Sequence, residues 1–331
     1  MVVSAVMLAV EFRERLRGGA GSFRDQLRLA THASTTRARL KKSLKIRLRL
    51  AAFNAMIRNG FMPIATIMPR RPGAADAFID AKLAAGVVGF PLVDLVKETG
   101  LSPTAAKNQL LRLGKWVVKV TRKHQFYLIV SPDHQTVGAP PANWWLNDYF
   151  KWLGHPYYLA LQSAAETYGS APQGLQVTQL MTDASRRDII VGRLCVRFFL
   201  KTAIQQTPTQ QLTNAYAPLQ VSTPAATVID LVRYASRIGG MEHAAETIIP
   251  LLPLIKVPEL RRALDAENEP ALGQRLGYIL ETASHEKLAL SVEDWLPAHP
   301  LWTPLVPAQV DRENMPVVPR WHLIKNANLL I

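Results

Sequence analysis

The segment from Gly100 to Pro103 constrains the fold of this chain more than any other. Glycine favours the left-handed conformation that ends a helix, whereas serine is a preferred N-cap and proline fits the first helical position. Gly100 and the pair Ser102-Pro103 therefore predict that one helix ends and the next begins within four residues. Gly114 is expected to end the second of these helices.

Residues 74 to 114 are expected to form three short helices. Their apolar faces are Phe78, Ile79 and Leu83 in the first, Leu92, Leu95 and Val96 in the second, and Ala106, Leu110 and Leu113 in the third. Gly86 is expected to close the first helix, and Pro91 to open the second. The spacing of these residues turns one apolar stripe of each helix toward a common core.

The third helix has a polar and basic side opposite its apolar residues. Spacings of i, i+3, i+4, i+8 and i+11 place five side chains there, with Gln109 beside them: Thr104, Lys107, Asn108, Arg112 and Lys115. Two helices joined by a short turn, the second of them carrying Lys, Asn, Gln and Arg outward, are typical of a helix-turn-helix. We therefore predict that this helix reads bases while phosphate contacts position the protein.

A β-hairpin is expected directly after this helix. Alternation predicts its two strands, with apolar residues Trp116, Val118 and Val120 in the first and Phe126, Leu128 and Val130 in the second. The turn at 121–125 is basic, and Lys119, Arg122 and Lys123 are expected to touch phosphates as the wing of a winged helix spanning residues 74–137. The alternative is an ordinary small bundle whose charges only solvate its surface.

The charge of the chain is concentrated before this region. The net charge is +14, and residues 1–71 hold 15 Lys and Arg against 3 Asp and Glu, whereas the rest holds 24 against 22. Residues 1–73 are therefore interpreted as a basic leader, disordered or partly helical. Two readings remain open for it: an arm that grips phosphates, or a solvated tail that could lie upstream of a start at Met56 or Met62.

Residues 138–331 mix helical and strand patterns. Asn143 can cap a helix through Phe150, Pro156 can open another that ends at Gly169, and strands are expected at 175–182, 188–200 and 216–221. Helices are expected again from Thr223 toward Gly239, and at 241–251, 257–266 and 270–283. The order predicts an α+β fold, with the winged helix ahead of a larger mixed domain, and not a doubly wound nucleotide-binding sheet.

Basic residues also gather around the predicted strands of this second region. They are Arg186, Arg187, Arg193, Arg197 and Lys201. The odd numbering of the last three would place them on one face of a strand. This face is either a solvated sheet surface or a possible surface for RNA, DNA or an acidic partner.

No catalytic constellation stands out in the sequence. The eight histidines form no metal-binding pair at short spacing, and no phosphate-binding loop, dinucleotide fingerprint or nucleophile elbow is present. The single cysteine, Cys195, lies in a predicted strand and is expected to be a small buried hydrophobe. We therefore expect no enzyme activity, no cofactor and no metal. No apolar stretch reaches the roughly 20 residues that span a membrane, so a cytoplasmic protein is expected.

Several segments in the same order resemble the AbiEi antitoxins of type IV toxin-antitoxin systems. The most specific are 138–145 (GAPPANWW), 156–169 (PYYLALQSAAETYG), 191–199 (VGRLCVRFF), 222–234 (STPAATVIDLVRY), 274–281 (QRLGYILE) and 321–326 (WHLIKN), with Gly239-Gly240 between them. The similarity extends over most of residues 80–328. The basic leader is not part of the family pattern.

The resemblance implies a winged helix that represses its own operon by binding promoter repeats, and a C-terminal antitoxin domain at 138–331. It further implies an AbiEii-like nucleotidyltransferase toxin as functional partner, countered without a stable complex. Asp230, Arg275 and Glu281 occupy positions similar to the family's and are interpreted as structural ion-pair partners. Two alternatives stay open: a metal-dependent nuclease or hydrolase with scattered catalytic residues, and a stand-alone regulator without antitoxin activity.

Overall fold

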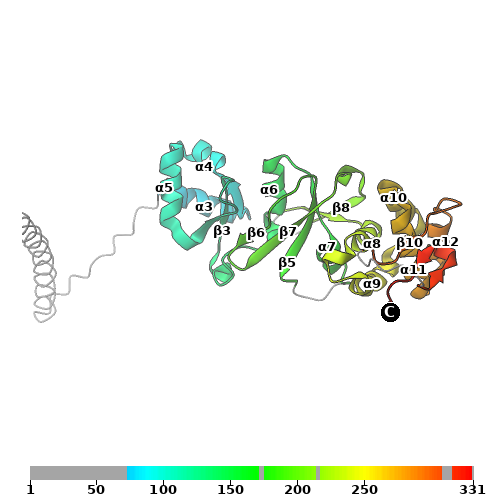
Figure 1. Ribbon diagram of the computed structural model, residues 1–331. Coiled ribbons are helices and arrows are strands. Elements are labelled where there is room, and N and C mark those ends of the chain that lie inside the picture. The colour runs from blue at the N-terminus through cyan, green and yellow to red at the C-terminus, as the bar shows by residue number, and fades with distance from the viewer. Residues whose placement is uncertain (1–72, 171–174, 214–216, 308–314, 330–331) are drawn as a thin grey trace, which may run out of the picture. The chain divides into compact units, whose positions relative to one another are not determined.

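The structure is a computed structural model that describes residues 73–170, 175–213, 217–307 and 315–329. The described residues fall in one compact unit, 72–331 (Figure 1). Helices and three β-sheets make up this described part of the chain, so the predicted α+β class is confirmed. Apart from Gly73, the leader predicted at 1–73 lies outside the described residues.

The first elements are three helices and a three-stranded sheet. Their bounds are α3 (Ala74–Ala84), β1 (Gly89–Pro91), α4 (Leu92–Thr99), α5 (Pro103–Leu113), β2 (Val117–Lys119) and β3 (Phe126–Ile129). The strands are antiparallel in the order β1-β3-β2. Phe90, Val117 and Ile129 face the helices and share a core with Leu95 and Leu110.

The other face of this small sheet is covered by α6 (Leu146–Leu153), which follows a single 3-10 turn at Ala142–Trp144. Phe126 and Leu128 on β3 belong to one hydrophobic cluster with Trp145 and Tyr149. Side chains of the larger sheet belong to the same cluster. The hydrophobic core is thus continuous across residues 137 and 138, where the sequence predicts a domain boundary.

The larger sheet has six strands in the order β6-β7-β5-β4-β9-β8. Their bounds are β4 (Tyr157–Leu159), β5 (Val177–Thr182), β6 (Ile189–Val191), β7 (Leu194–Leu200), β8 (Thr209–Leu212) and β9 (Leu219–Ser222). β7 and β5 are parallel, as are β4 and β9, whereas the other neighbours are antiparallel. One face, with Tyr157, Leu180 and Phe198, packs in the cluster around α6.

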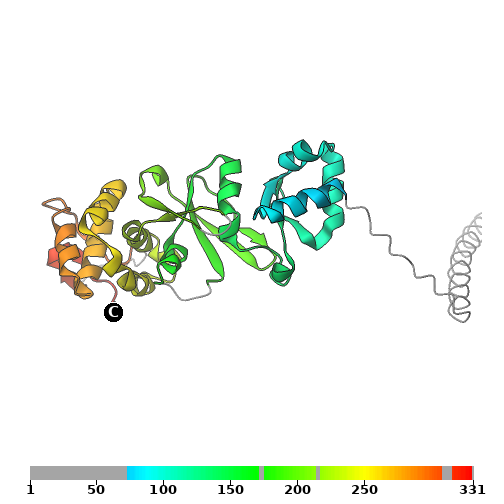
Figure 2. The same ribbon diagram turned by 180° about the vertical axis from the view of Figure 1, so that it is seen from behind.

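The opposite face, with Tyr158, Met181 and Phe199, belongs to one hydrophobic cluster with helices. They are α7 (Leu161–Thr167), α8 (Pro224–Arg233), α9 (Met241–Ile248), α10 (Val257–Glu267), α11 (Pro270–Thr282) and α12 (Glu286–Glu293). The helices after β9, yellow to red, gather together in both views (Figures 1 and 2). A small sheet of β10 (Thr303–Pro304), β11 (Val317–Val318) and β12 (Leu323–Ile324) completes the described chain.

Several sequence predictions in this region need correction. Asn143, expected to cap a helix, lies in the 3-10 turn Ala142–Trp144, and α6 begins at Leu146 with Trp145 at its N-cap. The helix expected from Pro156 begins only at Leu161, because Tyr157–Leu159 pairs as β4 with β5 and β9. The strand expected at 188–200 is a hairpin that turns at Gly192, where φ is +59° and an added Cβ would lie 2.1 Å from the Val137 carbonyl oxygen. The helix expected at 241–251 ends at Ile248 and continues as a 3-10 segment, Ile249–Leu254, that contains two prolines.

Candidate nucleic-acid interface

The helix α5 has the bounds that its capping residues predict. The Ser102 hydroxyl accepts a hydrogen bond from the Ala105 amide at 3.2 Å, and Pro103 occupies the first turn. Ala106 and Leu110, 0% and 3% exposed, hold the helix against the core. The opposite side of α5 therefore faces solvent.

Five of the six side chains predicted to contact DNA from this helix are exposed: Thr104, Lys107, Asn108 and Arg112 on α5, and Lys115, which lies beyond the end of α5 in the 3-10 turn Gly114–Trp116. The Lys115 amine lies 5.4 Å from the ring centre of Trp116, which is itself 43% exposed just after the helix. The outward face of α5 combines positive charge with amide and hydroxyl groups. These are the groups that contact phosphates and base edges.

Gln109, the sixth residue, is placed differently from the expectation. Its side-chain oxygen accepts a hydrogen bond from the Ala75 amide at 2.9 Å, in the first turn of α3. A helix start has backbone amides without partners inside the helix, and Gln109 satisfies one of them. We therefore correct its assignment from base reading to holding α5 against α3.

The hairpin between β2 and β3 presents a basic tip. Arg122 and Lys123 are exposed, as predicted. Lys119 is half-buried, and its amine donates to the Arg122 carbonyl oxygen at 2.9 Å. Lys119 therefore holds the turn together, while Arg122 and Lys123 are free to point into solvent.

His124 joins the tip to α6, and no motif in the sequence predicts this role. Its Nδ1 lies 2.6 Å from the Tyr149 hydroxyl, and its ring packs edge-on at 5.8 Å from Trp152. Burial lowers the pKa of His124, and the positive charges of Lys123, Arg186 and Lys119 lower it further. The neutral imidazole is therefore the form that fits this position.

The basic residues of the second region do not form one surface. Arg187, Arg193 and Arg197 are exposed, and Arg197 pairs with Asp188 at 3.3 Å. Arg186 is half-buried, with its guanidinium 5.8 Å from the ring centre of Phe150.

Lys201 is only 5% exposed, so its assignment to a basic surface is wrong. Its amine bonds to the Asp230 carboxylate at 2.7 Å and also pairs with Glu267. Arg197, within β7, is exposed, whereas Lys201, just after the end of β7, is covered by α8 and α10. Asp230 belongs to α8 and Glu267 to α10. A lysine can be buried there because two carboxylates accompany it.

The same buried cluster contains Asp230, one of the three residues at positions similar to the family's. Asp230, fully buried, also accepts a hydrogen bond from the Tyr158 hydroxyl at 2.9 Å. Burial raises the pKa of Asp230, and Lys201 opposes that shift. The interpretation of Asp230 as a structural ion-pair partner is confirmed.

Glu281 and Arg275 are also engaged inside the fold. Glu281 pairs with Arg320 at 2.8 Å and accepts from the indole of Trp321 at 2.7 Å. Arg275 donates to the Pro304 carbonyl oxygen at 3.1 Å. Glu281 is thus an ion-pair partner as expected, whereas Arg275 bonds to a backbone carbonyl.

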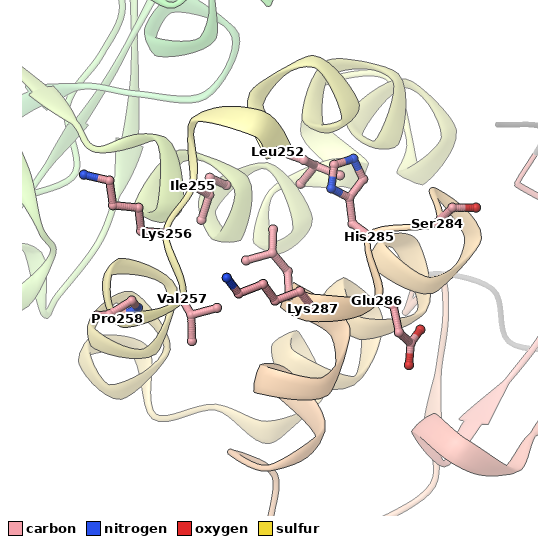
Figure 3. Close-up of a pocket in the computed structure, with 10 residues that line it drawn as sticks. Leu252, Ile255, Lys256, Val257, Pro258, Ser284, His285, Glu286 and Lys287 are labelled. Carbon is pink, nitrogen blue, oxygen red and sulfur yellow. The ribbon is translucent and has the colours of Figure 1, made fainter.

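A cavity of about 610 Å³ lies between the segment 252–258 and the start of α12. Apolar side chains such as Leu252 and Ile255 line it, together with His285 and Lys287 (Figure 3). The Glu286 carboxylate beside it is engaged by Arg320.

Across the described residues, no group of three or more His, Cys, Asp or Glu side chains is placed to hold a metal ion. No helix in the same part of the chain is long and apolar enough to cross a bilayer.

The fold and its exposed groups define an α+β protein that combines a basic helix and hairpin tip with a six-stranded sheet packed on helices. Residues 158–282, from β4 to the end of α11, match the family model of the AbiEi antitoxin C-terminal domain. This segment is therefore similar to AbiEi antitoxin C-terminal domains, and the resemblance to the AbiEi family is confirmed for these residues. No curated protein matches the sequence.

Two solved structures are similar to the chain. The crystal structure of the RV2827C protein from Mycobacterium tuberculosis is 17% identical, with a TM-score of 0.56 over 76% of this chain and 91% of that chain. At this identity the likeness shows a shared fold. An antigenic nucleotidyltransferase-like protein from Paracoccidioides brasiliensis is 11% identical, with a TM-score of 0.32 over 47% of this chain and 93% of that one, which is too low to carry an argument.

Proposed function

We propose that this protein is a cytoplasmic, non-enzymatic transcriptional repressor of its own operon and the antitoxin of an AbiEii-like nucleotidyltransferase toxin. In this proposal residues 74–137 are a winged helix-turn-helix, and α5 enters the major groove of promoter DNA. Lys107, Arg112, Lys115, Arg122 and Lys123 contact phosphates or bases, while Thr104 and Asn108 face base edges.

The arrangement around α5 is the observation that carries this proposal. The elements follow one another as helix, strand, helix, helix, strand, strand, and the sheet order is β1-β3-β2. Exposed cations occupy α5 and also the tip of the hairpin that follows it. A helix-turn-helix with a basic hairpin beside it can grip one duplex at two places.

The antitoxin part of the proposal rests on the family match at residues 158–282. The toxin is proposed to be countered without a stable complex. A toxicity assay in cells expressing the neighbouring nucleotidyltransferase gene tests this part, since a stand-alone regulator would leave the cells unprotected. Metal-dependent cleavage of nucleic acid by the purified protein would favour a nuclease instead.

The DNA-binding part is tested by replacing Lys107 and Arg112 together with alanine. Both side chains are exposed, so the fold should remain intact while affinity for promoter DNA falls at least tenfold. The charge-matched control is Lys256→Ala with Arg262→Ala, because both of these are exposed and lie at α10. Equal losses in the two double variants would mean that only total charge matters, and unchanged binding in the first would remove α5 from the interface.

A further inference from the structure

Leu111 is an apolar residue of α5 that does not belong to the predicted polar and basic side of the helix. It is 80% exposed, whereas Leu110 next to it is 3% exposed and lies in the core. Positions 104, 108 and 111 follow the spacing i, i+4 and i+7, so they form one stripe along α5, which ends at Leu113. Leu111 therefore lies on the outward face of α5, one turn after Asn108.

The structure gives Leu111 no part in packing. α3, α4, α5 and the sheet β1-β3-β2 share a core that includes Ala106 and Leu110 from α5. Leu113 packs against this core, whereas Leu111 does not belong to it. Its immediate neighbours Lys107, Asn108 and Arg112 are all exposed. A large apolar side chain surrounded by groups suited to phosphates and base edges is placed to meet an apolar group on the same ligand.

DNA offers one apolar group in the major groove, the 5-methyl group of thymine. Asn108, one turn earlier in the stripe, carries the amide that pairs with the N6 and N7 atoms of adenine. The two side chains together are suited to neighbouring A·T pairs. Gln109, the other amide on this helix, has its oxygen engaged at α3.

We propose that Leu111 is a specificity-determining residue that reads a thymine by contact with its 5-methyl group. This inference rests on the proposed function and deepens it, because it names the base that the last turn of α5 recognises. Burying one methyl group contributes about 0.8 kcal/mol, which corresponds to about fourfold in affinity.

The test uses the full chain and promoter DNA whose protected region has been mapped by footprinting. Each thymine in that region is replaced singly by deoxyuridine, which removes only the methyl group, and dissociation constants are measured for the wild type and for Leu111→Ala. At one thymine in each protected repeat, the wild type should lose about fourfold in affinity. Leu111→Ala should bind the thymine and deoxyuridine duplexes equally.

Ile190→Ala is the matched control, because Ile190 is 71% exposed on β6 and its loss should preserve the thymine preference. The inference is overturned if no single deoxyuridine weakens wild-type binding, or if Leu111→Ala keeps the discrimination. Its failure is distinct from failure of the proposed function. Specific binding that depends on Lys107 and Arg112 but ignores thymine methyl groups would sink only the inference, whereas the absence of any promoter preference would sink both.

Discussion

Asn108 and Gln109 are adjacent on α5, yet their amides lie in different environments. Asn108 is exposed, whereas the Gln109 oxygen accepts the Ala75 amide 34 positions earlier in the chain. Sequence spacing placed both near the outward face. It could not show that α3 would start beside Gln109, because that depends on how two helices pack.

This difference predicts opposite effects for two similar substitutions. Gln109→Ala should lower the free energy of unfolding by about 1 kcal/mol, since the Ala75 amide loses its partner, and should leave operator discrimination intact. Asn108→Ala should leave stability within about 0.5 kcal/mol and reduce discrimination between promoter and scrambled DNA. Urea unfolding and DNA titration of both variants check this, and an exchange of the two phenotypes would refute the assignment.

His124 predicts a pH dependence of stability. Its pKa is lowered in the folded state, so the unfolded chain takes up a proton first as the pH falls. The contribution is fully present above the unfolded pKa of about 6.5 and is lost as the pH falls from there through the folded pKa. The wild type should therefore lose more stability between pH 7.5 and pH 5 than His124→Asn does, in chemical unfolding at each pH. Parallel curves for the two proteins would contradict the burial of a neutral imidazole.

At the scale of elements, the sequence predicts helices that depend on local capping better than strands that depend on pairing with distant residues. Ser102, Pro103 and Gly114 fixed α5 correctly because capping acts within one turn of a helix. Pro156 predicts a helix start where the structure has β4, because Tyr157–Leu159 forms a strand only by pairing with the distant residues Leu180–Thr182 and Val221. Spacing along the helix predicts the outward basic residues of α5, whereas a pattern of polar residues does not indicate a role for the exposed Leu111.

Lys201, the residue after β7, ties the end of that strand to α8 and α10 through Asp230 and Glu267. Its burial was not evident from alternation in one strand, because the helices that cover it come later in the chain. Lys201→Ala leaves the Asp230 carboxylate buried without its cation, whereas Glu267 keeps Arg233 at 2.9 Å, and should lower the free energy of unfolding by about 3–5 kcal/mol. Arg197→Ala, which breaks the exposed pair with Asp188, should cost less than about 1 kcal/mol. Similar losses in the two variants, measured in urea, would contradict the cluster as described.

At the scale of the whole described molecule, α6 packs between the three-stranded sheet β1-β3-β2 and the six-stranded sheet. Trp145, 0% exposed, shares a hydrophobic cluster with Phe126 of the small sheet and Phe198 of the large one. A shared core predicts that both sheets unfold together, so tryptophan fluorescence and far-ultraviolet circular dichroism should report one coincident transition. Trp145→Ala should lower stability by about 3–5 kcal/mol in that single transition. Two separate transitions in the wild type would mean that the sheets are independent units.

The central claim is that α5 and the hairpin tip recognise promoter DNA without help from the basic leader. The most direct measurement is a titration of the full chain, and of a chain beginning at residue 73, against promoter DNA and a scrambled duplex at several salt concentrations. The account predicts that the shortened chain keeps its preference for the promoter, with a log-log salt slope of roughly −3.6 if about four phosphates are contacted. Loss of that preference on shortening would contradict the account and place recognition before residue 73.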